Sequence, residues 1–261
     1  MKNKHMLQFK NMALVLLLTL AVLHSCDEKV AKYEIGRMEG GSVTIDKKMD
    51  AHLWDSAVMV LDKYYSQAHA IMSDTIGYSD MVMKKNGKEN LIGNFTSDAL
   101  LAIGKDMFPS LNIDMSLMNL GGIRIDMPKG FITVGDIFAI YPFDNNITVI
   151  SLKGKDVRTL FDGFASRDNF EAFSGAKVVV KDKKIEKLTI NGKPVSDEKV
   201  YYIVTIDFVA EGNDNMRVLQ NALSRTDSDV KERDAFVDYV KKLTGEGRHL
   251  SAKIDGRIVE H

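Results

Sequence analysis

The sequence predicts an α+β fold, a single domain with a mixed, mostly antiparallel sheet and packed helices. Helical and strand patterns are intermixed along the chain without a regular strand–helix–strand repeat. The 261 residues are 45% hydrophobic and 27% charged, an ordinary globular composition with enough length for a sizeable core. The 35 basic and 36 acidic residues argue against a protein that binds nucleic acid through a strongly basic face.

Residues 1–25 have the pattern of a secretory signal peptide. Three lysines precede an apolar run over 12–23. As a helix this run would rise roughly 18 Å, too short for a hydrocarbon core of about 30 Å. Leu23, Ser25 and Cys26 resemble a bacterial lipoprotein box, in which the cysteine carries the lipid. We therefore expect a lipid anchor on Cys26 in the bacterial cell envelope, on the periplasmic or surface-exposed face of the outer membrane. The alternative is a lone thiol at the end of an uncleaved anchor.

Residues 26–69 are expected to form a tether and a linker helix that precede a domain over 70–261. Two short extended segments are expected over 31–37 and 42–45, and a helix over 52–69. The apolar residues that recur at helical spacing in this helix are Leu53, Ala57, Val60, Leu61, Tyr64, Tyr65 and Ala68.

Within the domain, hydrophobic periodicity and turn residues predict helices and strands in alternation. Strands are expected over 114–119, 146–153, 176–181, 184–190 and 199–207, with a closing strand over 250–258. Helices are expected over 90–105, 155–164, 214–224 and 229–243. The first of these helices has an apolar face of Leu91, Phe95, Ala99, Leu100 and Ile103. Because no regular βαβ repeat emerges, the sheet is not expected to be wholly parallel.

The residues that a self-sufficient metallophosphoesterase needs are not found in the sequence. A two-metal site takes many His, Asp and Asn ligands from several strand ends, and the histidines after Cys26 are isolated from one another. Asp50-Ala51-His52 is best explained as a helix start. A Walker-type phosphate loop and a Gly-x-Ser-x-Gly elbow are also absent from the sequence. We therefore expect no metal ligands, no cofactor and no catalytic residue in this chain.

Two segments place polar side chains where a site could form. Asn94 and Asp98 lie four residues apart and so share a face of the helix over 90–105, although a cap and a solvated face would look the same. In the second segment, Asn119 precedes a double glycine and Arg124 follows it. Glycines allow close backbone approach to a ligand, and a guanidinium can grip an anion with two donors. The alternative is a tight turn with a surface arginine.

A third segment places an aromatic residue before a polar turn. Phe208 ends a β-branched strand, and Asp214 follows six residues later. A nucleoside site needs such a pair, because the ring stacks on the base while the carboxylate accepts hydrogen bonds from the ribose hydroxyls. A core phenylalanine and a helix-capping aspartate would explain the same residues. Pro142-Phe143 precedes another polar turn and taken alone is expected to belong to the core.

Taken in order, these segments resemble the C-terminal, substrate-binding domain of the 5′-nucleotidase and UDP-sugar hydrolase family. The family has a Gly-Asn-x-x-x-Asp-Ala helix, an Asn-Gly-Gly-Gly-Ile-Arg loop, a Pro-Phe turn and a Phe-x-x-x-Gly-Gly-Asp-Gly turn. The corresponding residues here are Gly93-Asn94 with Asp98-Ala99, the loop over 119–124, Pro142-Phe143 and the turn over 208–215. The resemblance covers about residues 70–258 and includes the closing Asp255-Gly256-Arg257-Ile258.

The resemblance implies a role for each matching residue. Phe143 and Phe208 would sandwich the nucleobase, and Asp214 would hold the ribose hydroxyls. Arg124 would meet the phosphate, and Asn119 would lie in the base or sugar pocket. Some positions depart from the family pattern. Lys88 stands in place of a second phosphate-binding arginine, and Leu120, Asn213 and Asn215 replace glycines.

The function implied is a nucleotide- or nucleoside-binding subunit of a split 5′-nucleotidase that serves nucleotide catabolism. A separately encoded metallophosphatase would carry the two divalent metals, and the domain alone would bind without hydrolysing. The alternatives are a lipoprotein that captures nucleosides and a structural domain without a ligand. Trp54, Val58, Leu61 and Tyr65 are candidates for a docking face, although burial in the core is expected for most of them.

Overall fold

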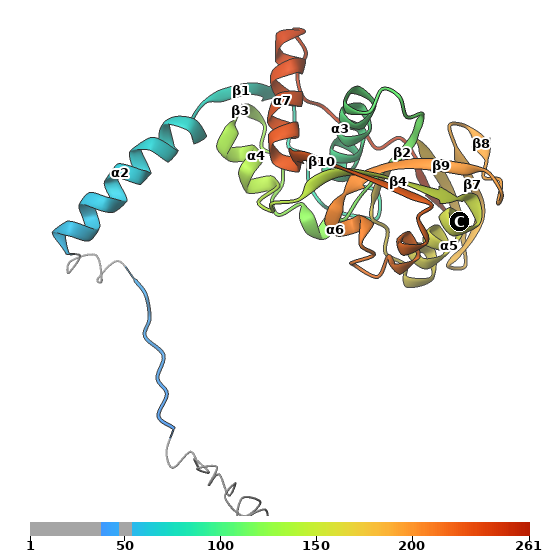
Figure 1. The fold of residues 1–261 in the computed structure, drawn as a ribbon, viewed down its shortest axis with the longest axis horizontal. Helices are drawn as coiled ribbons and strands as arrows, with labels where there is room; N and C mark the ends of the chain where they lie inside the picture. The colour runs from blue at the N-terminus through green and yellow to red at the C-terminus, as the bar shows by residue number, and fades with distance from the viewer. Residues whose placement is uncertain (1–37, 47–53) are drawn as a thin grey trace, which may run out of the picture. The chain divides into compact units, whose positions relative to one another are not determined.

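The computed structural model describes residues 38–46 and 54–261 (Figure 1). The chain divides after Trp54 into two units. In the first unit, residues 38–46 are exposed and have no regular secondary structure, so the extended segment expected over 42–45 does not form a strand. The signal peptide, Cys26 and the segment expected over 31–37 lie outside the described residues. The second unit, residues 55–261, contains the helices and strands described below.

Helix α2 (Asp55–Met72) is the linker helix, three residues displaced from the expected bounds. None of its residues is buried. Burial in the core, expected for most of its apolar residues, is therefore wrong: Leu61 and Tyr65 are 60% and 67% exposed, and Val58 is half-buried. Trp54, in the unit before α2, is exposed as well.

The central sheet has five strands in the order β10-β4-β9-β2-β5. The only parallel pair in it is β2 with β9, and the other three pairs are antiparallel, which confirms a mixed, mostly antiparallel sheet. The strands are β2 (Ile113–Met118), β4 (Asn146–Lys153), β5 (Ala172–Ser174), β9 (Val200–Ile206) and β10 (Ser224–Lys231).

Helices cover both faces of this sheet. The six interior residues of β4 are all buried, which requires cover on each side. In β5, Ala172 faces α3 (Leu91–Met107), whereas the next residue, Phe173, packs edge-on against Phe161 of α5 (Gly154–Arg167). Figure 1 shows α3 and α7 (Glu232–Gly245) on one side of the sheet and α5 with α6 (Asp207–Ala210) on the other.

Two smaller sheets complete the unit. β1 (Thr75–Ser79) and β3 (Gly130–Thr133) form an antiparallel ribbon, followed by α4 (Val134–Ile140). The second small sheet has the order β11-β6-β7-β8. Its strands are β6 (Ala176–Lys181), β7 (Lys184–Ile190), β8 (Lys193–Pro194) and β11 (Ile258–Glu260). The β6–β7 turn lies at Asp182 and Lys183, as predicted, and both residues have positive φ.

The C-terminal third differs most from the sequence-based expectation. The helix expected over 214–224 is wrong, because Asp214 begins a turn that leads to the short 3-10 helix η3 (Arg217–Asn221) and then to β10. The last helix begins at Glu232 rather than at 229, since the preceding residues pair with β4. The closing strand expected over 250–258 reduces to β11 and a single bridge at Leu250. Sequence patterns also missed the short elements β1, β3, β5, β8, α4 and α6.

Candidate functional site

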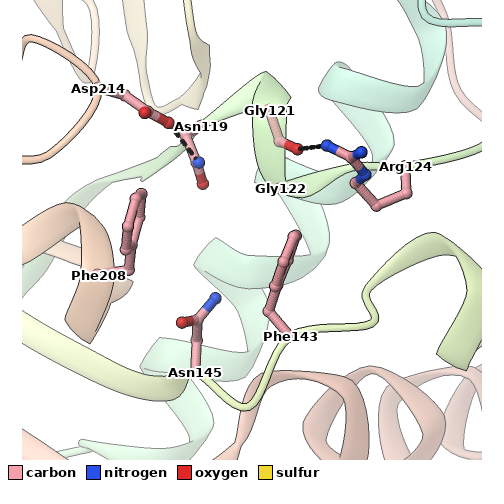
Figure 2. Close-up of a pocket in the computed structure, with 8 residues that line it drawn as sticks. All are labelled: Asn119, Gly121, Gly122, Arg124, Phe143, Asn145, Phe208 and Asp214. Atoms are coloured by element: carbon pink, nitrogen blue, oxygen red, sulfur yellow. Dashed lines mark hydrogen bonds between the residues drawn. The ribbon is translucent and has the colours of Figure 1, made fainter. Parts of the chain in front are cut away.

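A cavity of about 260 Å³ lies where β2, β9 and β4 meet the loops at one end of the central sheet. β2 and β9 run parallel and contribute their C-terminal ends, whereas the antiparallel β4 contributes its N-terminal end. The lining residues are Asn119, Gly121, Gly122, Arg124, Phe143, Asn145, Phe208 and Asp214 (Figure 2). The sheet thus brings together residues that lie up to 95 positions apart in the chain.

Two aromatic rings form opposite walls of the cavity. Phe143 follows α4 and Phe208 lies in the first turn of α6, and Figure 2 shows their rings facing each other across the space. They are 45% and 38% exposed, so neither belongs to the core. Two π faces that are open to solvent can stack on a planar ring placed between them.

Contacts beneath the cavity hold both aromatic walls. Tyr141, two residues before Phe143, is buried and stacks on Phe236 of α7 with ring centroids 4.2 Å apart. The Asp207 carboxylate accepts the Phe208 N–H at 2.7 Å and the Asn146 N–H at 3.0 Å. The Asp207 carboxylate therefore links the turn that carries Phe208 to the loop that follows Phe143.

Asn119 and Asp214 form a polar edge of the cavity. The Asn119 Nδ2 donates to Asp214 Oδ2 at 2.6 Å. Because this bond fixes the amide, Asn119 Oδ1 points into the cavity, where it is buried and has no hydrogen-bond partner in the protein (Figure 2). Asp214 itself is exposed and has a φ of 52°, a left-handed conformation reached through the turn after α6. An acceptor-only carboxylate and a free amide oxygen can both receive hydrogen bonds from a sugar or a base.

The double-glycine loop is held by two residues that the sequence did not single out. The carboxylate of Glu171 accepts the Leu120 N–H at 2.6 Å, and burial raises the pKa of this glutamate. The Lys85 ammonium donates to Leu120 O at 3.2 Å and to Ile123 O at 2.6 Å. A side chain at Gly122 would place its Cβ 2.9 Å from Asn119 Oδ1, so any other residue here would displace the Asn119 amide. No local sequence signal marks Lys85 or Glu171, because both act on a loop that is distant in the chain.

Arg124 stands exposed at the rim of the cavity. Its guanidinium donates to Gly121 O at 3.2 Å and lies 5.9 Å from the centroid of the Phe143 ring. A guanidinium held this loosely can turn toward an anion at the cavity mouth, where it offers several donors at once.

Lys88 does not lie at this cavity, contrary to the phosphate-binding role expected from its place in the sequence. Its ammonium pairs with Asp168 and with Glu260, the latter at 2.6 Å. Hydrogen bonds to these two carboxylates raise the pKa of Lys88. The charge is therefore already compensated by the protein.

Asn94 and Asp98 are also structural. Asn94 Nδ2 donates to Glu89 Oε1 at 2.9 Å and to Lys253 O at 2.8 Å. Asp98 pairs with the buried guanidinium of Arg257 at 3.0 Å. These residues attach the C-terminal segment to α3 and take no part in the cavity.

Asn145 also lines the cavity, although no role was predicted for it from the sequence. Figure 2 shows its side chain between the two phenylalanine rings. The available signal was the polar turn after Pro142-Phe143, in which any of several Asn and Asp residues could have faced a ligand. Which one does so depends on the course of the loop into β4.

Over residues 38–46 and 54–261, no group of three or more His, Cys, Asp or Glu side chains is placed to hold a metal ion. Over the same residues, no helix has the length and hydrophobicity that a membrane span requires.

Comparison with known proteins gives consistent matches. A family model described as "5'-nucleotidase, C-terminal domain" matches residues 70–221. The trifunctional nucleotide phosphoesterase YfkN of Bacillus subtilis is 26% identical over 88% of this chain and 17% of its own length. The UshA protein of Escherichia coli is 27% identical over 49% of this chain and 24% of its own length.

Solved structures show the same fold. The 5'-nucleotidase precursor of Thermus thermophilus superimposes with a TM-score of 0.67 and 27% identity over 78% of this chain and 43% of that protein. The NAD nucleotidase of Haemophilus influenzae gives a TM-score of 0.58 at 19% identity, over 79% of this chain and 41% of that protein. This chain therefore spans less than half the length of each of these four relatives.

Proposed function

The chain belongs to the 5′-nucleotidase C-terminal domain family, whose members use this domain to bind nucleotides, and from that premise we propose that its cavity binds a nucleoside or a nucleotide. One observation carries the proposal: Phe143 and Phe208 face each other across an open cavity with Asp214 at one edge and Arg124 at the rim. A base stacked on aromatic side chains gains roughly 1–3 kcal/mol per base, which is enough to select planar ligands.

Five of the lining residues are assigned to parts of the ligand. The base lies between Phe143 and Phe208. The ribose hydroxyls donate to Asp214, which the Asn119 amide orients at 2.6 Å. The phosphate of a nucleotide meets Arg124 at the cavity mouth. Asn119 Oδ1, buried and without a partner, accepts a hydrogen bond from the base or the sugar.

We propose further that hydrolysis, as part of nucleotide catabolism, is carried out by a separately encoded metallophosphatase that holds two divalent metals. In this arrangement the present chain supplies the substrate-binding half. The exposed apolar residues of α2 support a protein partner, because an uncovered stripe that includes Leu61, Tyr64 and Tyr65 is typical of a docking surface.

The membrane anchoring and the domain limits are proposals that rest on the sequence. Residues 1–25 are proposed to be removed as a signal peptide, and lipid on Cys26 is proposed to hold the chain at the outer membrane. Residues 26–69 are proposed to form the tether and most of the linker helix, which ends at Met72, and residues 70–261 are proposed to form the nucleotide-binding domain.

Calorimetric titration of adenosine and AMP into the chain tests the binding site. Phe208→Ala should weaken the binding of both ligands by about fivefold or more, because it removes one stacking face. Phe131→Ala is the matched control, since Phe131 is 74% exposed but lies on β3 outside the cavity. Unchanged binding in Phe208→Ala and in Asp214→Ala would refute the site. No heat with either ligand would favour a structural domain without a ligand.

The proposed partner is tested by measuring AMP hydrolysis in a mixture of the two proteins. A metallophosphatase encoded beside this chain should hydrolyse AMP faster when the chain is added, and Leu61→Glu with Tyr65→Glu should remove the gain. Phosphatase activity that is indifferent to the chain would favour the alternative of a lipoprotein that only captures nucleosides.

A further inference from the structure

We propose that Glu171 is a positioning residue for ligand binding: its side chain holds the Leu120 N–H and so keeps the preceding residue, Asn119, aimed into the cavity. The inference rests on the proposed nucleoside site. Glu171 does not line the cavity, and it lies 51 positions from Leu120 in the chain. It therefore acts on the ligand only through Asn119.

The pairing of β5 with β2 brings Glu171 to the loop. In this antiparallel pair Met118 lies opposite Ala172. The residue after β2 therefore meets the residue before β5, which puts Asn119 opposite Glu171 at the end of the sheet. Glu171 is 9% exposed, so its carboxylate is enclosed at the point where the loop leaves the sheet.

The peptide group between Asn119 and Leu120 is held at both ends. Its N–H donates to Glu171 Oε2 at 2.6 Å, and its C=O accepts the Gly122 N–H at 3.1 Å. A planar peptide group that is held at both ends restricts rotation of the adjoining backbone bonds, and so it restricts where the Asn119 side chain points. The bond from Nδ2 to Asp214 at 2.6 Å then fixes the amide, with the buried Oδ1 left to the ligand.

Glu171 provides the one contact that the loop cannot provide for itself. Leu120 is the first residue of the 3-10 helix η2 (Leu120–Gly122), so its N–H has no acceptor within that turn. The Leu120 C=O is already bound, because it accepts the Ile123 N–H and the Lys85 ammonium, both at 3.2 Å. Without Glu171 the peptide group would lose one of its two restraints, and the ordering of Asn119 would then oppose ligand binding.

The test is the affinity for adenosine, measured by calorimetry on variants of the full chain. Glu171→Met removes the acceptor but keeps the length of the side chain, and it should weaken adenosine binding by about tenfold, as expected for one lost hydrogen bond. Glu171→Gln should bind within about twofold of the wild type, because its amide oxygen still accepts the Leu120 N–H. Asp168→Asn is the matched control on the same connection between α5 and β5, since Asp168 pairs with Lys88 outside the cavity.

A double-mutant cycle with Asn119→Ala separates positioning from a general effect on the fold. In the Asn119→Ala background, Glu171→Met should weaken adenosine binding by less than about twofold further, because the residue through which it acts has been removed. A full tenfold loss in that background would overturn the inference, and so would an unchanged affinity in Glu171→Met alone. Equal losses in Glu171→Gln and Glu171→Met would also overturn it, since the acceptor would then not matter.

Two further outcomes are covered. If Glu171→Met fails to fold, as judged by circular dichroism, Glu171→Ala replaces it in the same cycle and under the same criteria. If the wild-type chain does not bind adenosine, the proposed function and this inference fall together. Wild-type binding that Phe208→Ala weakens and Glu171→Met does not would overturn this inference alone.

Discussion

Replacing Glu232 by glutamine should remove a pH-dependent cost of folding. In the unfolded chain this glutamate has its ordinary pKa of 4.5, and burial raises it to about 8 in the folded protein. The pKa difference of about 3.5 corresponds to about 5 kcal/mol at about 1.4 kcal/mol per pKa unit. Because the folded-state pKa is the higher one, the stabilisation by the bound proton is complete below pH 4.5 and is lost as pH rises through about 8.

The assay is urea unfolding of both proteins, followed by circular dichroism, at several values between about pH 5 and about pH 9. The unfolding free energy of the wild type, relative to that of Glu232→Gln, should fall by about 1.4 kcal/mol per pH unit until it levels off above about pH 8. Taking the difference between the two proteins cancels the contribution of other titrating groups. Among them are Asp168, Asp227 and Asp255, whose lowered pKa values make the unfolding free energy fall toward acid pH in both proteins.

Glu198→Gln provides the matched control, since the Glu198 side chain is 81% exposed. Its difference from the wild type should stay nearly constant over the same range. A constant difference for Glu232→Gln as well would refute the conclusion that the buried carboxyl group is neutral at pH 7.

Three further predictions concern other parts of the chain. Arg124→Gln should weaken the binding of AMP by about tenfold and leave the binding of adenosine unchanged, because only the phosphate meets the guanidinium. Equal losses of affinity for both ligands in calorimetry would contradict this. Arg257→Met should lower the unfolding free energy by about 3 kcal/mol in urea. Arg257 is 6% exposed, and its guanidinium binds Asp98, Asp255 and Phe173 O. The loss is limited because Asp98 is half exposed and can be hydrated when left alone. Cys26→Ser should move the chain from the membrane to the soluble fraction of cells, and retention in the membrane would exclude lipidation as the anchor.

The secondary structure was predictable where side-chain patterns agree with backbone pairing. β4, β6 and β7 have the bounds that their apolar patterns predict. β10 was missed because its sequence, SRTDSDVK, is polar and largely exposed, and pairing with β4 through the backbone makes it a strand. In α2 the helical periodicity was correct, but periodicity alone did not show that its apolar stripe is left uncovered.

The cavity was partly predictable in the same way. Motif resemblance selected Asn119, Arg124, Phe143, Phe208 and Asp214, and the structure places all five at one cavity. It also selected Lys88, which two carboxylates hold elsewhere. The polar turn after Phe143 did not distinguish Asn145 from its polar neighbours.

The sequence by itself determined the fold class, the signal-like N-terminus and the set of motifs, because these depend on residue types and on short-range spacing. Only the tertiary structure decided which residues meet. The strand order β4-β9-β2 brings the ends of three strands together and so forms one cavity from segments far apart in the chain. Burial then decided the charge of Glu232, because a pKa depends on the solvent, charges and hydrogen bonds around a group, and these exist only once distant segments have packed.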